Sequence, residues 1–240
     1  DHVLFLMSAR CSNLPVMTRH SRWLKKYIQT NPDGSYFLGD GKMGFHMPTS
    51  WPQHHFISLN NAVALSLLWS PYLSTTQRLF HLRSELFVKN GYTFEAFADF
   101  FNKILFDTAC ELVPDKPRGF CSLSSTLDGS MGNFFEVDLT RSGDQGWVIN
   151  PPFVETIMDQ IAEKVLPYGD RVPMVIIFPE WVDASGYVKL ENSGFFHSCN
   201  PDMAFMCENG KIFHGIRVTV FQNKGAQDKG LFSRLSLSGD

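Results

Sequence analysis

The stretch Gly146-Trp147-Val148-Ile149-Asn150-Pro151-Pro152-Phe153 decides the fold of this chain. It opens with apolar residues, as a short buried strand does, and Asn-Pro-Pro-Phe follows directly. Beyond it, apolar residues recur at helical spacing with polar residues between them: Val154, Ile157, Met158, Ile161, Ala162 and Val165. A strand that passes through a short loop into an amphipathic helix predicts one unit of an α/β sheet.

The flanking segments extend this pattern. Strands are predicted over 93–98, 134–137 and 174–178, the last apolar on both faces as in a central parallel strand. Helices are predicted over 75–89, ended by Asn90-Gly91, and over 100–112. A hairpin of 203–207 and 216–222 is predicted to complete the sheet. Alternating strands and helices predict a Rossmann-like α/β fold.

Residues 1–90 are predicted to form a largely helical or irregular appendage, and residues 91–240 the core. A short basic helix is expected over 18–28 and a buried helix over 60–69. Asn31-Pro32-Asp33-Gly34 is a strong turn signal, and 36–47 is predicted to be a hairpin. The apolar start of the chain lacks a basic leader and is not expected to be a signal peptide.

Composition restricts the class of protein. The net charge of -3 excludes a strong global attraction to nucleic acid, so any such contact must be local. Five cysteines without a CxxC pair favour reduced thiols in a cytosolic or nuclear protein. No apolar run has the length of a membrane helix, and no membrane partner is expected. His54-His55 lacks partners at metal-ligand spacing, so no metal is expected.

Asn150-Pro151-Pro152-Phe153 has the residue types that hold an aromatic amine for reaction. The exocyclic amine of adenine is a poor nucleophile because its lone pair is delocalised into the ring. The Asn150 side-chain carbonyl and a carbonyl of the proline pair supply acceptors for its hydrogens, which favours a pyramidal, nucleophilic nitrogen. Prolines fix φ and hold their carbonyls in place. Phe153 offers a flat face for stacking the base. The competing interpretation is a Pro-Pro helix start capped by Asn150.

Asn150 to Phe153 resembles the (Asp/Asn/Ser)-Pro-Pro-(Tyr/Phe/Trp) signature of amino-group methyltransferases. Further motifs lie around it in a recognisable order: Phe94-Glu95-Ala96-Phe97-Ala98, Asn102, Asp128-Gly129-Ser130, Val137-Asp138-Leu139 and Ile177-Phe178-Pro179-Glu180-Trp181. Over roughly Phe94 to Trp181 the chain resembles the phosphorylated-CTD-interacting-factor family of cap-specific adenosine N6 methyltransferases. No WW module is visible, so docking on RNA polymerase is not predicted.

The resemblance implies a class I methyltransferase fold, S-adenosylmethionine as cofactor and capped messenger RNA as substrate. Cofactor contacts are expected from the segment after the first core strand and from an acid further along: Glu95, Phe97, Ala98, Asp99, Asn102 and Asp138. Asp99 and Asp138 are equally explained as helix caps or turn residues. Asp128 to Gly132 is a lid, a phosphate loop or a solvated loop.

Glu180 and Trp181 are expected to touch the substrate base or cap, although Trp181 also suits the rim of a core. Arg78, Arg83, His81 and the basic run 19–26 are the local positive charge available for phosphates. Two rival functions remain open at this point. One is the same chemistry on internal RNA adenines or DNA, and the other is a catalytically silent cap- or RNA-binding module.

Overall fold

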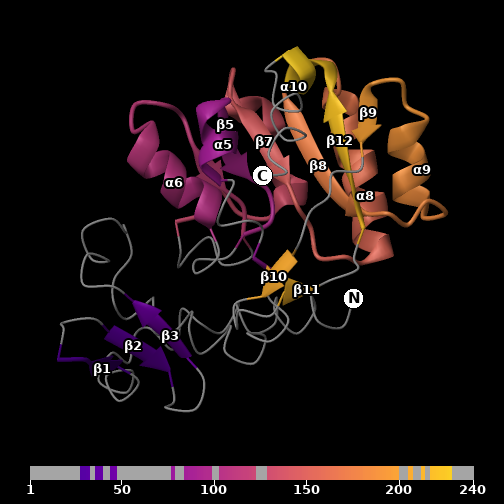
Figure 1. Ribbon diagram of the computed structural model, residues 1–240. Coiled ribbons are helices and arrows are strands. Elements are labelled where there is room, and N and C mark those ends of the chain that lie inside the picture. The colour runs from indigo at the N-terminus through magenta and orange to yellow at the C-terminus, as the bar shows by residue number, and fades with distance from the viewer. Residues whose placement is uncertain are drawn as a thin grey trace, which may run out of the picture.

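The computed structural model of the protein describes residues 28–32, 36–39, 44–47, 77–78, 84–98, 103–122, 129–199, 205–207, 212–213 and 217–228. These residues form α-helices, short 3₁₀ helices and three β-sheets (Figure 1). The main sheet has six strands in the order β6 (Gly119–Phe120), β5 (Tyr92–Glu95), β7 (Gly146–Ile149), β8 (Met174–Pro179), β12 (Val218–Asn223) and β9 (Phe196–Cys199).

Strand direction gives this sheet a defined carboxyl end. Strands β6, β5, β7 and β8 are mutually parallel, whereas β12 is antiparallel to both β8 and β9. The carboxyl end of the sheet is here the end at which β5, β7 and β8 finish and at which β12 begins. The strand predicted over 174–178 is therefore confirmed as an interior strand, parallel to β7 on one side.

Helices cover both faces of the main sheet. Helices α8 (Glu155–Val165) and α9 (Ser185–Glu191) pack on one face. On the other lie α5 (Ser84–Lys89), α6 (Ile104–Leu112) and α10 (Lys224–Asp228). Each face encloses its own apolar core, and the strands supply alternate residues to the two cores. The predicted α/β class is confirmed as a mixed sheet between two helical layers.

The order of the strands creates a switch point between β5 and β7. From β5 the chain passes through α6 to β6 on one side of β5. It then returns to β7 on the other side of β5 and passes through α8 to β8. These two crossovers progress in opposite directions and use opposite faces, as right-handed connections require. The loops after β5 and β7 therefore diverge, and ligands bind at such a crevice in open α/β sheets.

The end of α5 and the buried face of α8 agree with the prediction from the sequence. Gly91 has φ of 79° and ends α5, as Asn90-Gly91 indicated. The apolar positions of α8 predicted for the core are buried: Ile157, Met158, Ile161, Ala162 and Val165. Val154 instead takes the extended N-cap position and is 39% exposed.

Two small sheets lie outside the main one. β1 (Ile28–Thr30), β2 (Tyr36–Gly39) and β3 (Gly44–Met47) form an antiparallel sheet, which confirms the hairpin predicted over 36–47. All elements described before Ser84 are strands, and α5 packs on the main sheet although it precedes the expected boundary at residue 90. The helix expected over 60–69 lies outside the described residues, as do residues 18–27 of the helix expected over 18–28, whose last residue, Ile28, begins β1.

The strand predicted over 134–137 is wrong. Phe134–Glu136 and Leu139–Ser142 are 3₁₀ helices, η3 and η4. The Asn133 side chain accepts a hydrogen bond from the Phe135 N–H, and Asp138 accepts one from the Thr140 N–H. These local side-chain bonds favour turns over a sheet ladder. The prediction failed because the apolar pair Phe134-Phe135 resembles part of a strand.

The helix predicted from Thr75 and the terminal hairpin are also corrected. Gln77–Arg78 is a strand, β4, that pairs with β10 (Phe205–Cys207), and the helix begins only at Ser84. β10 pairs with β11 (Ile212–Phe213) rather than with β12. β12 instead inserts between β8 and β9. The pairings of β10 with β4 and of β12 with β8 join residues far apart in sequence, where local periodicity carries no information.

Candidate active site at the carboxyl end of the main sheet

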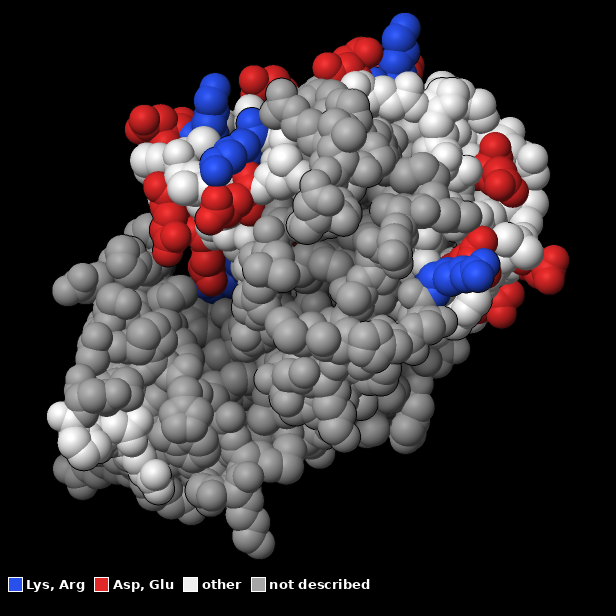
Figure 2. Space-filling model, in the orientation of Figure 1, with Lys and Arg blue, Asp and Glu red and all other residues white. Residues whose placement is uncertain are grey.

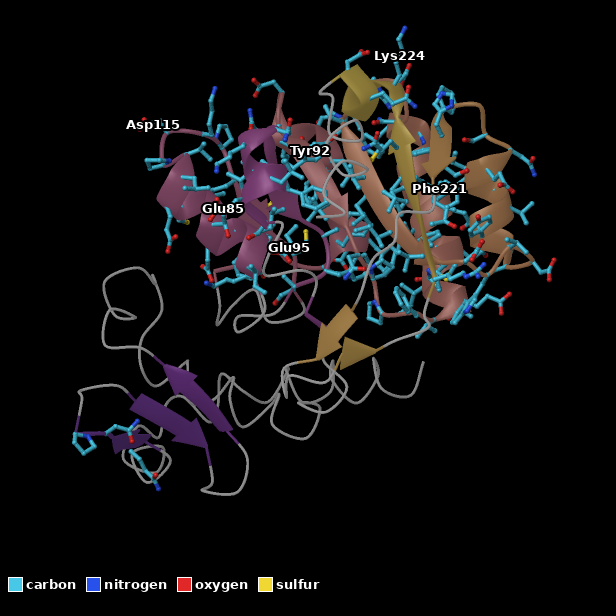
Figure 3. All side chains as sticks on the ribbon, viewed as in Figure 1. Glu85, Tyr92, Glu95, Asp115, Phe221 and Lys224 are labelled. Carbon is cyan, nitrogen blue, oxygen red and sulfur yellow. The ribbon has the colours of Figure 1, made fainter. Side chains whose placement is uncertain are left out.

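The two segments singled out in the sequence meet at the switch point. β5 ends at Glu95 and β7 ends at Ile149, with Asn150 immediately after it. The Ala96 N–H donates to the Val148 carbonyl over 2.9 Å, so the backbone beyond Glu95 runs beside the backbone that leads into Asn150. Glu95 lies at the carboxyl end of the sheet in Figure 3, and Lys224 lies at the opposite end. The sheet thus brings Glu95 and Asn150 together.

The Asn150 side chain presents a buried, unused acceptor. Its Oδ1 is buried and has no hydrogen-bond partner among the described residues. The helix that follows begins at Glu155, with Val154 as its N-cap and without a side-chain cap bond. Asn150 therefore does not cap a helix, and the prolines do not start one. This geometry removes the competing structural explanation of the motif.

The proline carbonyls are distinguished by the turn that follows them. The Pro152 carbonyl accepts the Val154 N–H over 2.8 Å, whereas no hydrogen bond to the Pro151 carbonyl occurs within the described segments. Pro151 is buried and Pro152 is exposed. Of the two carbonyls, that of Pro151 is consequently the one available, beside Asn150 Oδ1, to accept a hydrogen from a bound amine.

Phe153 and Trp181 form an aromatic pair across the ends of β7 and β8. Their ring centroids lie 6.5 Å apart with an interplanar angle of 68°. Phe153 is partly buried against the core on the α6 side of the sheet, whereas Trp181 is 45% exposed. Trp181 is thus not a buried core residue. Together the rings make a partly open aromatic wall, which is suited to a planar ligand.

The turn after β8 holds Trp181 in place through its backbone. The Glu180 N–H donates to the Arg217 carbonyl over 3.0 Å, and the Trp181 N–H donates to Pro179 over 2.7 Å. The Trp181 carbonyl in turn accepts the Ala184 N–H over 2.9 Å. These bonds restrict the backbone of the turn from which the indole extends beside Phe153. Glu180 is itself half-buried.

A second aromatic group lies on the β5 side of the switch point. The Phe97 ring packs on Phe134, with centroids 5.2 Å apart, and on Phe135 at 6.0 Å. The loop at Met131 is tied to β6 by a hydrogen bond from the Met131 N–H to the Phe120 carbonyl of 2.8 Å. Phe97, Ala98 and Glu95 are partly exposed here, as a ligand-lining segment requires.

Sequence reasoning did not identify Phe134, Phe135 or Met131 as neighbours of this segment. The available signal was Asn133, an N-cap residue directly before the phenylalanine pair. An N-cap residue at this position indicates a turn, which places the two phenylalanine rings near the segment that follows β5. The loop at Gly129 to Gly132 is thus attached to the sheet rather than fully solvated, since the Ser122 N–H also donates to the Gly132 carbonyl over 3.0 Å.

Asp138 is placed differently from its prediction. It follows no strand; it is exposed and caps η4 through Thr140, with bonds of 3.0 Å from the backbone N–H and 2.9 Å from the hydroxyl. These two bonds, and more weakly Lys164 and Tyr168, lower the pKa of Asp138. Lys164 and Tyr168 lie at or beyond the last turn of α8, the far end of that helix from Asn150. Asp138 therefore caps a 3₁₀ helix, as its alternative explanation predicted, and its contact with a cofactor stays a prediction.

Several predicted site residues lie outside the described part of the chain: Asp99, Asn102, Asp128, Arg83, His81, His54, His55 and the basic run 19–26. Arg78 is described only as part of strand β4. Among the described residues, no three His, Cys, Asp or Glu side chains are grouped as a metal site would need. Likewise, no helix in those ranges is long and apolar enough to cross a membrane.

This site provides hydrogen-bond acceptors, and the amide and carbonyl oxygens concerned are not strong bases. Asn150 Oδ1 and the Pro151 carbonyl accept hydrogens, and the Phe153–Trp181 pair supplies apolar surface. Such a site suits a planar, nitrogen-bearing ring whose amine points at Asn150. Residues 74–211, more than half of the chain, match the family described as "phosphorylated CTD interacting factor 1 WW domain". No curated protein sequence matches the chain significantly.

Proposed function

The chain belongs to the phosphorylated CTD interacting factor 1 WW domain family, and from that premise we propose that it is an S-adenosylmethionine-dependent methyltransferase. Its proposed substrate is the N6 amine of the adenosine next to the cap of messenger RNA. The observation that carries this proposal is the buried Oδ1 of Asn150, which has no hydrogen-bond partner among the described residues. A buried acceptor of this kind costs stability, which favours a functional role for it.

The proposed chemistry follows from the acceptors. The adenine amine donates one hydrogen to Asn150 Oδ1 and the other to the Pro151 carbonyl, which draws its lone pair out of conjugation with the ring. Interactions that strengthen as the nitrogen becomes pyramidal lower the barrier to methyl transfer. The new bond joins N6 to the methyl carbon, and the carbon–sulfur bond of the donor breaks. Amide oxygens are weak bases, so the released proton passes to solvent.

The β5 side of the crevice fits the cofactor. S-adenosylmethionine supplies the electrophilic methyl group when bound. The Glu95 carboxylate, at the strand end beside Asn150, is the proposed partner of its ribose hydroxyls. Phe97 and Ala98 offer partly exposed apolar surface for its adenine. In this division, β5 serves the cofactor and β7 with β8 serves the substrate base, which matches a class I methyltransferase arrangement.

The proposed preference for a cap rests on shape rather than on charge. The net charge is -3, and on the face in Figure 2 the basic and acidic side chains of the described residues are intermixed. Non-specific affinity for RNA is therefore expected to be weak. A positively charged 7-methylguanine is attracted to aromatic faces by cation–π interaction, and 14% of the residues are aromatic.

The family name adds a partner that the sequence motifs did not predict. It refers to a phosphorylated CTD. A nuclear location is the proposal that accords best with this name and with cysteines that form no CxxC pair.

Methyl transfer to matched oligonucleotides tests the proposal. Transfer to a capped RNA beginning with adenosine is expected at least about tenfold faster than to its uncapped twin, a difference of roughly 1.4 kcal/mol in transition-state stabilisation. Mass spectrometry of the digested product locates the label on N6. Equal rates would favour internal sites, and methylated DNA would favour a DNA substrate. Cofactor binding by calorimetry without any transfer would favour a silent binding module.

A further inference from the structure

The antiparallel direction of β12 brings a cation to the proposed site. Arg217 directly precedes β12, which begins at Val218. Because β12 runs opposite to β8, its first residue lies at the carboxyl end of the sheet, where Asn150 also lies. The hydrogen bond from the Glu180 N–H to the Arg217 carbonyl, of 3.0 Å, fixes Arg217 beside the Glu180-Trp181 turn.

The Arg217 side chain is available for a ligand. It is exposed and forms no ion pair with a carboxylate of the described residues. Three lysines of the described part do form ion pairs: Lys89 with Glu85, Lys103 with Asp107, and Lys189 with Asp159 and Glu163. An exposed arginine that has no ion pair among the described residues is suited to bind an anionic group.

The surroundings of Arg217 indicate the kind of anion. Trp181 and Val182, in the adjoining turn, are 45% and 52% exposed. Proteins hold single-stranded nucleic acid through phosphate contacts from cations and stacking on aromatic rings, and here the two residue types come from segments joined by a backbone hydrogen bond. Glu180 and Asp183 lie in the same turn, so this surface is not a general polyanion patch. It is suited to one phosphate at a defined place.

We propose that Arg217 is a positioning residue that binds a backbone phosphate flanking the adenosine to be methylated. This inference rests on the proposed function. Asn150 follows β7, and Arg217 precedes β12 two strands away, about 10 Å across the sheet at ordinary strand spacing. The register places Arg217 level with Glu180 and Asn150 level with Ile177, which adds about 10 Å along the strands. The long arginine side chain spans part of this distance. Contact with the neighbouring phosphate orients the strand so that the target base enters between β7 and β8.

Equilibrium binding of a fluorescent capped single-stranded RNA, measured at several salt concentrations, tests the inference. Arg217→Ala is expected to weaken binding about fivefold to tenfold at low salt. It should also reduce the slope of log affinity against log salt by about 0.7, the loss of one phosphate contact in a single strand. Arg217→Lys should restore most of that slope, because lysine keeps the charge.

Lys224→Ala is the matched control. Lys224 directly follows β12, so it is an exposed cation at the other end of the same strand. Its substitution should leave affinity and salt slope unchanged. An unchanged slope in Arg217→Ala, an equal loss in Lys224→Ala, or no measurable binding by the unsubstituted chain would overturn the proposal. Thermal melting confirms that each variant is folded.

The readouts separate this inference from the proposed function. If methyl transfer is absent but the salt slope falls only in Arg217→Ala, the phosphate contact stands and the reaction is wrong. If transfer proceeds and the slope is unchanged, the reaction stands and Arg217 has no such role. Within an active enzyme, a positioning role predicts a higher KM for the oligonucleotide with kcat nearly constant.

Discussion

At the scale of the residue, substitution of Asn150 is expected to affect activity but not stability. Its Oδ1 is buried without a hydrogen-bond partner among the described residues, an arrangement that costs about 1–3 kcal/mol in other proteins. Asn150→Ala is therefore expected to leave the melting temperature unchanged or slightly higher. It should slow methyl transfer by about 10²–10³-fold, because a transition-state hydrogen bond is lost. Single-turnover rates and thermal melts measure the two effects, and near-normal turnover would contradict the assignment.

Phe153 is predicted to act through its aromatic ring. Phe153→Ala should raise KM or lower kcat by about tenfold, the value of one stacking contact of roughly 1–3 kcal/mol. Phe153→Tyr and Phe153→Trp should retain measurable activity, since both keep a flat face beside Trp181. Steady-state kinetics on the capped oligonucleotide make the comparison. An equal loss in all three variants would assign Phe153 to packing instead.

At the scale of the element, the close contact of α8 with α9 depends on Gly186. A Cβ added to Gly186 would lie 2.4 Å from the backbone carbonyl carbon and oxygen of Met158, which cannot move aside as a side chain does. Gly186→Ala is expected to lower the free energy of unfolding by about 1–3 kcal/mol. Denaturant titration measures this change.

Gly225→Ala in α10 is the control for that substitution. Its added Cβ would meet Pro173 at 3.5 Å, an ordinary contact. Because alanine is the better helix former by about 0.5–1 kcal/mol, this variant should be unchanged or more stable. Similar destabilisation in both variants would show that helix contact is not the cause.

An ion-pair group also links α8 and α9, and it makes their association depend on pH. Lys189 Nζ lies 2.6 Å from Asp159 Oδ1 and 2.8 Å from Glu163 Oε1. The hydrogen bonds from Lys189 and Ser185 hold the pKa of Asp159 below its usual value. The two carboxylates raise the pKa of Lys189. The stabilisation is thus lost as pH falls through the lowered Asp159 pKa, and again as pH rises through the raised Lys189 pKa.

Asp159→Asn is expected to lower the melting temperature by about 2 °C between roughly pH 5 and 9, since exposed pairs contribute little. The difference from the unsubstituted chain should vanish once the pH is below the lowered Asp159 pKa, where the carboxyl is protonated in both the folded and the unfolded state. Glu191→Gln, at an exposed acid of α9, is the control and should show no such dependence. A difference that persists in acid would contradict the electrostatic account.

At the scale of the whole molecule, Asn223 joins parts that are distant in sequence. Its Nδ2 donates to the Gly169 and Val172 carbonyls, and its Oδ1 accepts the N–H groups of Met174 and Ala226. One buried amide thus ties the end of β12 to the start of β8 and to α10. Asn223→Ala is expected to cost about 3 kcal/mol or more, because several buried backbone groups lose their partners.

The adjacent Gln222 is the control for Asn223. It is fully buried, but its side-chain Oε1 and Nε2 have no hydrogen-bond partner among the described residues. Gln222→Leu, which replaces this amide with an apolar group of similar volume, is therefore expected to be neutral or stabilising. Chemical denaturation of both variants gives the comparison. A large loss in Gln222→Leu would mean that its amide has a partner in the folded protein.

Sequence alone determined the unit from Gly146 to Val165. Its strand, loop and helix follow from apolar spacing and turn chemistry within some twenty neighbouring residues, and the structure reproduces them. The motif Asn150 to Phe153 could be located at a strand end for the same reason. Local patterns predicted the wrong element where the same residues suited two structures. At Phe134-Phe135 the apolar pair resembles a strand, although Asn133 caps a 3₁₀ turn.

Only the tertiary structure decided what surrounds that motif. The insertion of β12 between β8 and β9 and the approach of Trp181 to Phe153 both depend on strand order. Strand order is set by contacts between segments tens of residues apart. Those contacts bury apolar surface that no local window reveals. The sequence therefore predicted candidate residues for the chemistry, and the folded sheet determined which of these candidates meet.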